Sequence, residues 1–188
     1  MDATKHNSTA TALFNTVAIL FDFENVTRAF RHRLLKPEKF SEEAGFEELI
    51  DRITKQVGKI VMFCLFIPDY FLEKGYVSKK NLEFFQSKGF FTIVCPKIGP
   101  KRKDTSDLNM IKFGLDVMLP YFSGITHICI GSGDVDFLEL CEKVKRSGHK
   151  LMVTMGSNIS LSGDVRKMVD INPKTGEKMI YLFSPIRR

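Results

Sequence analysis

The sequence predicts an α/β fold in which a mostly parallel central sheet is flanked by helices. Short, continuous apolar runs recur along the chain, as expected for strands that are buried on both faces of a parallel sheet. Segments with apolar residues at helical spacing lie between these runs. Gly89 and Gly148 each stand between a helical segment and the next apolar run, where a left-handed helix C-cap is common.

Each of six apolar runs is predicted to form one strand. They are VAILFDF at 17–23, KIVMFCLFI at 59–67, FFTIVC at 90–95, THICI at 126–130, KLMVTM at 150–155 and MIYLF at 179–183. The last run is the weakest and follows the turn-like segment INPKTGEK at 171–178, so we expect it at an edge of the sheet.

Four segments between the strands are predicted to be helices. The segment 46–57 places Phe46, Leu49, Ile50 and Ile53 on one face, and the segments 78–87, 108–119 and 135–146 show the same spacing. A helix between consecutive parallel strands implies right-handed crossovers and a sheet that is covered on both faces.

Length and composition limit the class of protein. A chain of 188 residues is long enough for one core, and we expect a polar, flexible N-terminal tail at 1–16 and a single domain at 17–188. No apolar run approaches the roughly 18 residues of a membrane span, which predicts a soluble, cytoplasmic protein. Four scattered cysteines without C-x-x-C spacing favour buried, reduced thiols over disulfides or a zinc site. The oligomeric state is left open and is compatible with a homodimer.

Acidic side chains follow three of the predicted strands. Asp22 ends the first strand, Asp134 and Asp136 follow the fourth, and Asp107 opens the helix after the third. Since ligands of open α/β sheets bind outside the carboxyl ends of the strands, we expect these carboxylates at the same rim if the first and fourth strands are neighbours. Carboxylates gathered there repel one another unless a cation neutralises them, and hard oxygen ligands suit Mg²⁺ or Mn²⁺.

The same residues have other interpretations. Each aspartate taken alone is explained as a helix cap. The loop GSGDVD does not match the dinucleotide pattern G-x-G-x-x-G, and the chain has no G-K-[ST] of a P-loop. Ser132 has no obvious histidine partner for a nucleophile elbow.

Three stretches of the chain resemble a known family. ILFDFENV, KRKDTSDLNMIKFGLDVM and ICIGSGDVDFLELCEKVKRSGHKLMV are similar to the NYN domain family, which is related to LabA-like proteins and to PIN-domain ribonucleases. The resemblance extends over about residues 17–183. It implies a PIN-like three-layer sandwich and a metal-dependent ribonuclease site.

Carried over residue by residue, the resemblance assigns Asp22 and Asn25 to the first family motif, Asp107 to the acid that opens the third helix, and Asp134 and Asp136 to the last motif. One position departs from the family. Members commonly have a second aspartate about two turns into that helix, where this chain has Phe113, and Asp116 comes later. In a regular α-helix Asp116 lies on the opposite face from Asp107, so it is not placed among the metal ligands.

The resulting hypothesis is a metal-dependent endoribonuclease that uses Mg²⁺ or Mn²⁺. Asp22, Asp107, Asp134 and Asp136 are the candidate catalytic residues and metal ligands, and Asp136 binds either directly or through water. The candidate phosphate and RNA contacts are Asn25, Ser132, Lys101, Arg102 and Lys103, because the net charge is +6 and the basic run KIGPKRK at 97–103 precedes Asp107. The RNA is either single-stranded or structured.

Two alternatives stay open. A toprim-like phosphoryl-transfer domain also uses D-x-D after a strand, but it requires a catalytic glutamate after the first strand, where only Glu24 is available. A catalytically weak or inactive NYN-type module would keep the fold and bind RNA without efficient metal binding.

Overall fold

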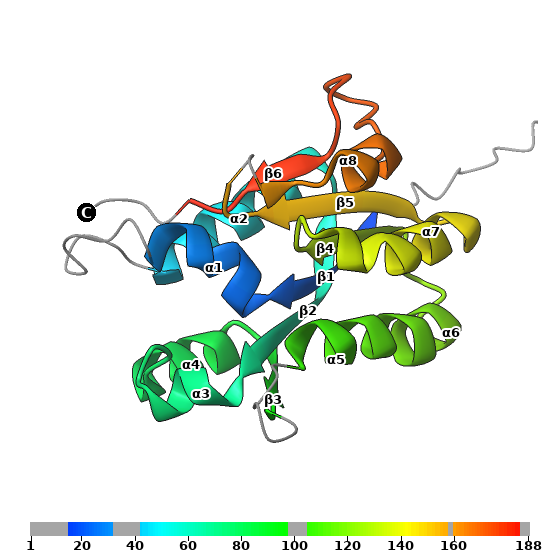
Figure 1. The fold of residues 1–188 in the computed structure, drawn as a ribbon. Helices are drawn as coiled ribbons and strands as arrows, with labels where there is room; N and C mark the ends of the chain where they lie inside the picture. Colours follow the sequence, from blue (N-terminus) through cyan, green and yellow to red (C-terminus); the bar gives the residue numbers. More distant parts are fainter. Residues whose placement is uncertain (1–14, 32–41, 98–104, 158–159, 185–188) are drawn as a thin grey trace, which may run out of the picture.

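The fold is described from a computed structural model that places residues 15–31, 42–97, 105–157 and 160–184 (Figure 1). Within these residues six strands form one sheet with the order β3-β2-β1-β4-β5-β6, and all neighbouring pairs are parallel. The α/β fold class and the edge position of the last strand are therefore confirmed. The strands are β1 (Thr16–Asp22), β2 (Lys59–Pro68), β3 (Phe91–Cys95), β4 (His127–Gly131), β5 (Lys150–Met155) and β6 (Ile180–Leu182).

The central strands are apolar because both of their faces are covered. Val17 to Asp22 of β1 and all residues of β4 are buried. Alternate residues of β1 contact opposite layers: the ring of Phe21 packs against Phe46, whereas Leu20 faces Gly114 and so lies on the other side of the sheet. This arrangement is the three-layer sandwich that the sequence predicts.

The predicted helices are present, and three short ones were not predicted. The helix expected at 46–57 is α2 (Glu42–Gln56), and the one at 78–87 is α4 (Lys79–Ser87). The segment 135–146 is a 3₁₀ turn, η3 (Val135–Phe137), followed by α7 (Leu138–Arg146). Gly89 and Gly148 have φ values of 74° and 84°, as predicted for C-caps. The additional helices are α1 (Phe23–Arg31), which follows β1 directly, and the shorter α3 (Asp69–Glu73) and α8 (Gly163–Met168).

A cluster of phenylalanines joins the sheet to the layer that contains α2 and α4. Phe46 of α2 is fully buried, and its ring centroid lies 5.1 Å from that of Phe21 on β1 and 5.3 Å from that of Phe85 on α4. The ring of Phe183, after β6, is 4.9 Å away. Phe46 is therefore the centre of this half of the core.

The helix predicted at 108–119 extends over 106–121 and contains a π-helical segment. It consists of α5 (Ser106–Lys112), η2 (Phe113–Met118) and α6 (Leu119–Tyr121). Met110, Gly114 and Met118 are buried, and a Cβ at Gly114 would lie 2.7 Å from Cδ1 of Leu140 on α7. The absence of a side chain at Gly114 thus allows the close approach of this helix to α7.

The chain order creates a switch point between β1 and β4. After β1 the chain adds β2 and β3 on one side, and it then returns to add β4, β5 and β6 on the other. The crossovers that leave β1 and β4 diverge, and ligands of doubly wound sheets bind in the resulting crevice at the carboxyl ends. The expectation that β1 and β4 are neighbours is confirmed by their parallel pairing, in which Phe21 is opposite Gly131.

The four cysteines are free and buried, as predicted. Burial raises the pKa of the Cys64 and Cys141 thiols to about 12, so both thiols are protonated at neutral pH. Among the described residues no helix has the length and apolar character of a membrane span.

Candidate functional site

Two of the predicted carboxylates meet at the switch point. Asp22 ends β1 and is only 3% exposed, whereas Asp107 lies in the first turn of α5 and is exposed to solvent. Their side chains are hydrogen-bonded to each other. The backbone N–H of Asn25 donates to Oδ1 of Asp22 at 3.2 Å, so Asp22 also caps the first turn of α1. The capping hydrogen bond therefore uses only one oxygen of the Asp22 carboxyl group.

The surroundings of Asp22 oppose its ionisation. Burial raises the pKa of Asp22 well above its usual range, and the hydrogen bond and charge of Asp107 raise it further. Glu24 adds a smaller effect in the same direction, whereas the Asn25 N–H lowers the pKa. The pair thus requires either a shared proton or a cation, because two ionised carboxylates in contact repel each other.

The start of α5 is anchored so that Asp107 faces the end of β1. The hydroxyl of Thr105 donates to the carbonyl oxygen of Pro96, just after β3, at 2.7 Å. The side-chain amide of Asn109 donates to both the carbonyl and the hydroxyl oxygen of Thr105, each at 2.9 Å. Thr105 and Asn109 were not singled out in the sequence, although their i, i+4 spacing around Asp107 was a usable signal.

Close packing of neighbouring backbone explains both glycines of the turn after β4. A Cβ at Gly131 would lie 2.7 Å from Cα of Phe21, and one at Gly133 would lie 2.9 Å from Cα of Leu161. The carbonyl of Gly133 accepts a hydrogen bond from the N–H of Ser162 at 2.8 Å. Among the described glycines, those with a positive φ do not include either of these two. Both glycines are required because neighbouring backbone approaches them closely.

Asp134 and Asp136 lie on the strand end next to Asp22, and both are exposed. Oδ1 of Asp134 accepts the backbone N–H of Asp136 at 3.4 Å, which caps the 3₁₀ turn η3. Ser132 is fully buried, and its Oγ accepts the N–H of Asp134 at 3.3 Å. Its hydroxyl therefore supports the turn that presents Asp134.

The structure does not gather all four predicted ligands into one set. Within the described residues, no three His, Cys, Asp or Glu side chains are placed to hold one metal ion. The contact that is present joins Asp22 and Asp107, and the roles of Asp134, Asp136, Asn25 and Ser132 stay predictions. Lys101, Arg102 and Lys103 lie outside the described residues.

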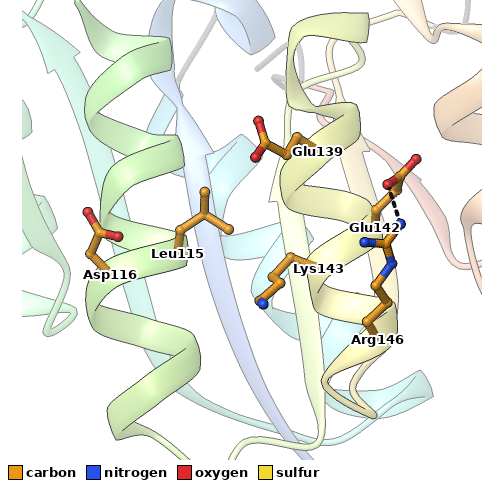
Figure 2. A pocket seen from close by; sticks show the side chains of 6 residues that line it. All are labelled: Leu115, Asp116, Glu139, Glu142, Lys143 and Arg146. Atoms are coloured by element: carbon orange, nitrogen blue, oxygen red, sulfur yellow. Dashed lines mark hydrogen bonds and ion pairs between the residues drawn. The ribbon is translucent and has the colours of Figure 1, made fainter.

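A groove of about 400 Å³ separates η2 from α7 and is distinct from the carboxylate pair. Figure 2 shows Leu115 projecting toward α7, while Glu142 and Arg146 of α7 also line the groove and form an ion pair of 2.9 Å. Both signs of charge line the groove, which includes Asp116 and Glu139 as well as Lys143. Asp116 lines this groove, whereas Asp107 is not among its lining residues.

The comparison with family models decides the assignment. The model of the NYN domain matches residues 16–170, which is most of the chain and contains all four predicted aspartates. The chain belongs to the NYN domain family. Comparisons with curated proteins and with solved structures found no match. The NYN assignment agrees with the observed PIN-like sandwich, whose nuclease-type fold carries Asp22 and Asp107 at the carboxyl ends of its strands.

Proposed function

We propose that this NYN protein is a metal-dependent endoribonuclease that hydrolyses RNA phosphodiester bonds at the carboxyl ends of β1 and β4. The observation that supports this proposal most strongly is the contact between the Asp22 and Asp107 carboxyl groups at the switch point. A buried carboxyl group in contact with a second carboxyl group is costly for the fold, which makes a purely structural role for Asp22 without a ligand less favourable. A cytoplasmic location is part of the proposal, since four free thiols are typical of a reducing compartment.

The chemistry of this pair suits Mg²⁺ or Mn²⁺. Magnesium commonly binds to one or two protein carboxylates and keeps several waters, so two contacting carboxylates at a solvent-facing rim are a sufficient protein ligand set. A bound ion would supply charge neutralisation at the scissile phosphate and an activated water nucleophile at neutral pH. Asp22 and Asp107 would hold this ion.

The chain's own residues then have separate tasks. Asp22 is fixed by burial and by the Asn25 N–H, so it provides a rigid ligand, whereas Asp107 faces solvent and the substrate. Asp134 and Asp136 contribute from the adjoining strand end, where they orient water or the substrate strand. The net charge of +6 favours binding of the RNA backbone.

The test combines manganese binding with RNA cleavage. Calorimetry should detect Mn²⁺ binding by the wild-type chain and lose it in Asp22→Asn and Asp107→Asn, and both variants should lose cleavage of an RNA panel. Asp51→Asn is the matched control, because this exposed carboxylate on α2 pairs only with Lys55 at 2.8 Å among the described residues. If Asp22→Asn and Asp107→Asn cleave as fast as Asp51→Asn, the proposal is wrong.

A second candidate function is an RNA-binding NYN module with weak or no catalysis. The observation that favours it is the lack of a three-ligand metal group in the described part of the chain. Under this alternative the wild-type chain binds RNA in the presence of a chelator but shows no Mn²⁺ binding. The same calorimetric titration therefore separates the two candidates.

A further inference from the structure

Basic and aromatic side chains meet at the ends of β2 and β3, next to the carboxylate pair. Tyr70 is the second residue of α3, which directly follows β2 (Figure 1). The ammonium group of Lys97, two residues after β3, lies 3.9 Å from the centroid of the Tyr70 ring, and that of Lys74 lies 5.6 Å from it. Two cations from different parts of the chain are thus held against one ring, which stabilises their positions.

Within the part of the chain that the structure describes, neither ammonium group is neutralised by a carboxylate. Among the described residues, Lys74 and Lys97 form no ion pair. Asp69, the nearest acid in sequence to Tyr70, accepts the backbone N–H of Lys97 through Oδ2 at 3.0 Å, and its Oδ1 is buried. Asp69 therefore positions Lys97 without presenting its second oxygen to solvent. The two charges remain available to an anion.

A series of ring contacts connects this rim to the carboxylate pair. Phe23 directly follows Asp22, and its ring packs edge-on against Phe71 with a centroid distance of 5.9 Å. Phe71 is buried and contacts Tyr70 at 4.7 Å and Tyr76 at 5.6 Å. Tyr76 is 50% exposed. A rigid aromatic core therefore places both tyrosines beside the end of β1.

We propose that Lys74, Lys97 and Tyr76 bind a single-stranded segment of the RNA substrate next to the bond that is cleaved. The two ammonium groups contact backbone phosphates, and the exposed ring of Tyr76 stacks on a base. This inference rests on the proposed function, because it takes RNA as the ligand of the neighbouring site. Stacking on a protein ring requires an unpaired base, so the rim selects single strands over duplexes.

Binding is tested with the full chain, a short labelled single-stranded RNA and a chelator that prevents cleavage. The double substitution Lys74→Gln and Lys97→Gln should weaken binding and reduce the slope of log K against log salt by roughly 0.7 for each lysine. The control is Lys59→Gln with Lys150→Gln, which removes two exposed lysines at the amino ends of β2 and β5 and should change neither quantity. Equal effects of the two double substitutions would overturn the inference.

Tyr76 has three variants that distinguish stacking from packing. Tyr76→Ala should weaken binding about 5- to 150-fold, and Tyr76→Phe should retain wild-type affinity. Tyr76→Leu keeps apolar contact with Phe71 but has no ring, so it should bind as weakly as Tyr76→Ala. Wild-type affinity in Tyr76→Leu would refute stacking, and a duplex RNA that binds as tightly as the single strand would refute the predicted selectivity.

Cleavage with Mn²⁺ separates a failure of this inference from a failure of the proposed function. The rim variants should raise KM and leave kcat at saturating RNA unchanged. A wild-type chain that cleaves, combined with rim variants that bind normally, refutes the rim and leaves the nuclease intact. A wild-type chain that does not cleave, combined with rim variants that lose RNA binding, refutes the nuclease and supports the rim.

Discussion

Replacing Gly133 with alanine tests whether close backbone packing positions the aspartate turn after β4. The added Cβ would lie 2.9 Å from Cα of Leu161 and closer still to the carbonyl oxygen of Ser160. Both neighbours are backbone atoms, and contacts of Cβ below 3.0 Å are essentially never seen, so the segment has to move by roughly half an ångström or more. The hydrogen bond from Ser162 N–H to the Gly133 carbonyl, 2.8 Å long, is strained by the same movement.

The expected cost of Gly133→Ala follows from these two effects. Overpacking costs about 1–3 kcal/mol, and a weakened hydrogen bond adds about 0.5–1.5 kcal/mol. The free energy of unfolding should fall by roughly 2–4 kcal/mol, and Tm should fall by about 4–15 °C for a chain of this size. Because Asp134 is the next residue, we also expect slower RNA cleavage by the molecules that remain folded.

Thermal unfolding with a matched glycine provides the measurement. Gly163 begins α8 and has no heavy atom within 4 Å of a built Cβ, so Gly163→Ala should leave Tm unchanged or slightly raised. A Tm of Gly133→Ala that equals that of Gly163→Ala would show that the turn tolerates a side chain. The packing explanation of the S-G-D sequence would then be wrong.

Three further predictions concern other parts of the molecule. Since the pKa of Asp22 is raised in the fold, the free energy of unfolding of the wild type in a chelator should fall as pH rises from about 4, the unfolded pKa, through the folded pKa. Over that range Asp22→Asn should have a higher Tm than the wild type, and the difference should grow with pH. The pKa of Asp170 shifts in the opposite direction: partial burial opposes its ionisation, but hydrogen bonds from Lys145 at 2.8 Å and from the Leu151 N–H at 2.7 Å lower the pKa. Asp170→Asn should therefore reduce the free energy of unfolding by on the order of 1–3 kcal/mol at pH 7. This difference should disappear when pH falls below the folded pKa of Asp170. Phe46→Ala should cost about 3–5 kcal/mol in denaturant unfolding, and Phe46→Leu should cost clearly less, with cleavage per folded molecule unchanged in both.

The sheet could be predicted from the sequence because its central strands are buried on both faces, although the edge strands β3 and β6 are partly exposed. Such strands are continuous apolar runs, and each of the six runs is a strand in the structure. The helices α3 and α8 could not be predicted in the same way, since five and six residues carry too few turns for a periodic pattern. The helix α1 was missed because it begins directly after β1, without a separating turn. Their positions depend on tertiary contacts, such as that of Phe71 in α3 with Phe23.

The candidate site was predictable in its location and only partly in its geometry. A carboxylate at the end of a parallel strand must lie at the rim, which located Asp22 and Asp134 from sequence alone. The contact of Asp107 with Asp22 depends on the anchoring of Thr105 to Pro96, a hydrogen bond between a loop and a helix start that no local periodicity contains. The side chain of Asp134 caps η3, and the sequence alone does not distinguish such a cap from a metal ligand.

The helix 106–121 supplies fewer carboxylates than the family pattern because Phe113 stands at the second acidic position, where the π-helical segment η2 also begins. The segment begins at Phe113, the position at which the family pattern leads one to expect a second aspartate. Wider turns let Gly114 sit under Leu140 while Met110 and Met118 stay buried, and Asp116 is left exposed beside the α7 groove. Asp107 is then the acid from this helix that meets Asp22. The affinity of the Asp22–Asp107 pair for manganese is consequently the quantity that decides between a nuclease and an RNA-binding module.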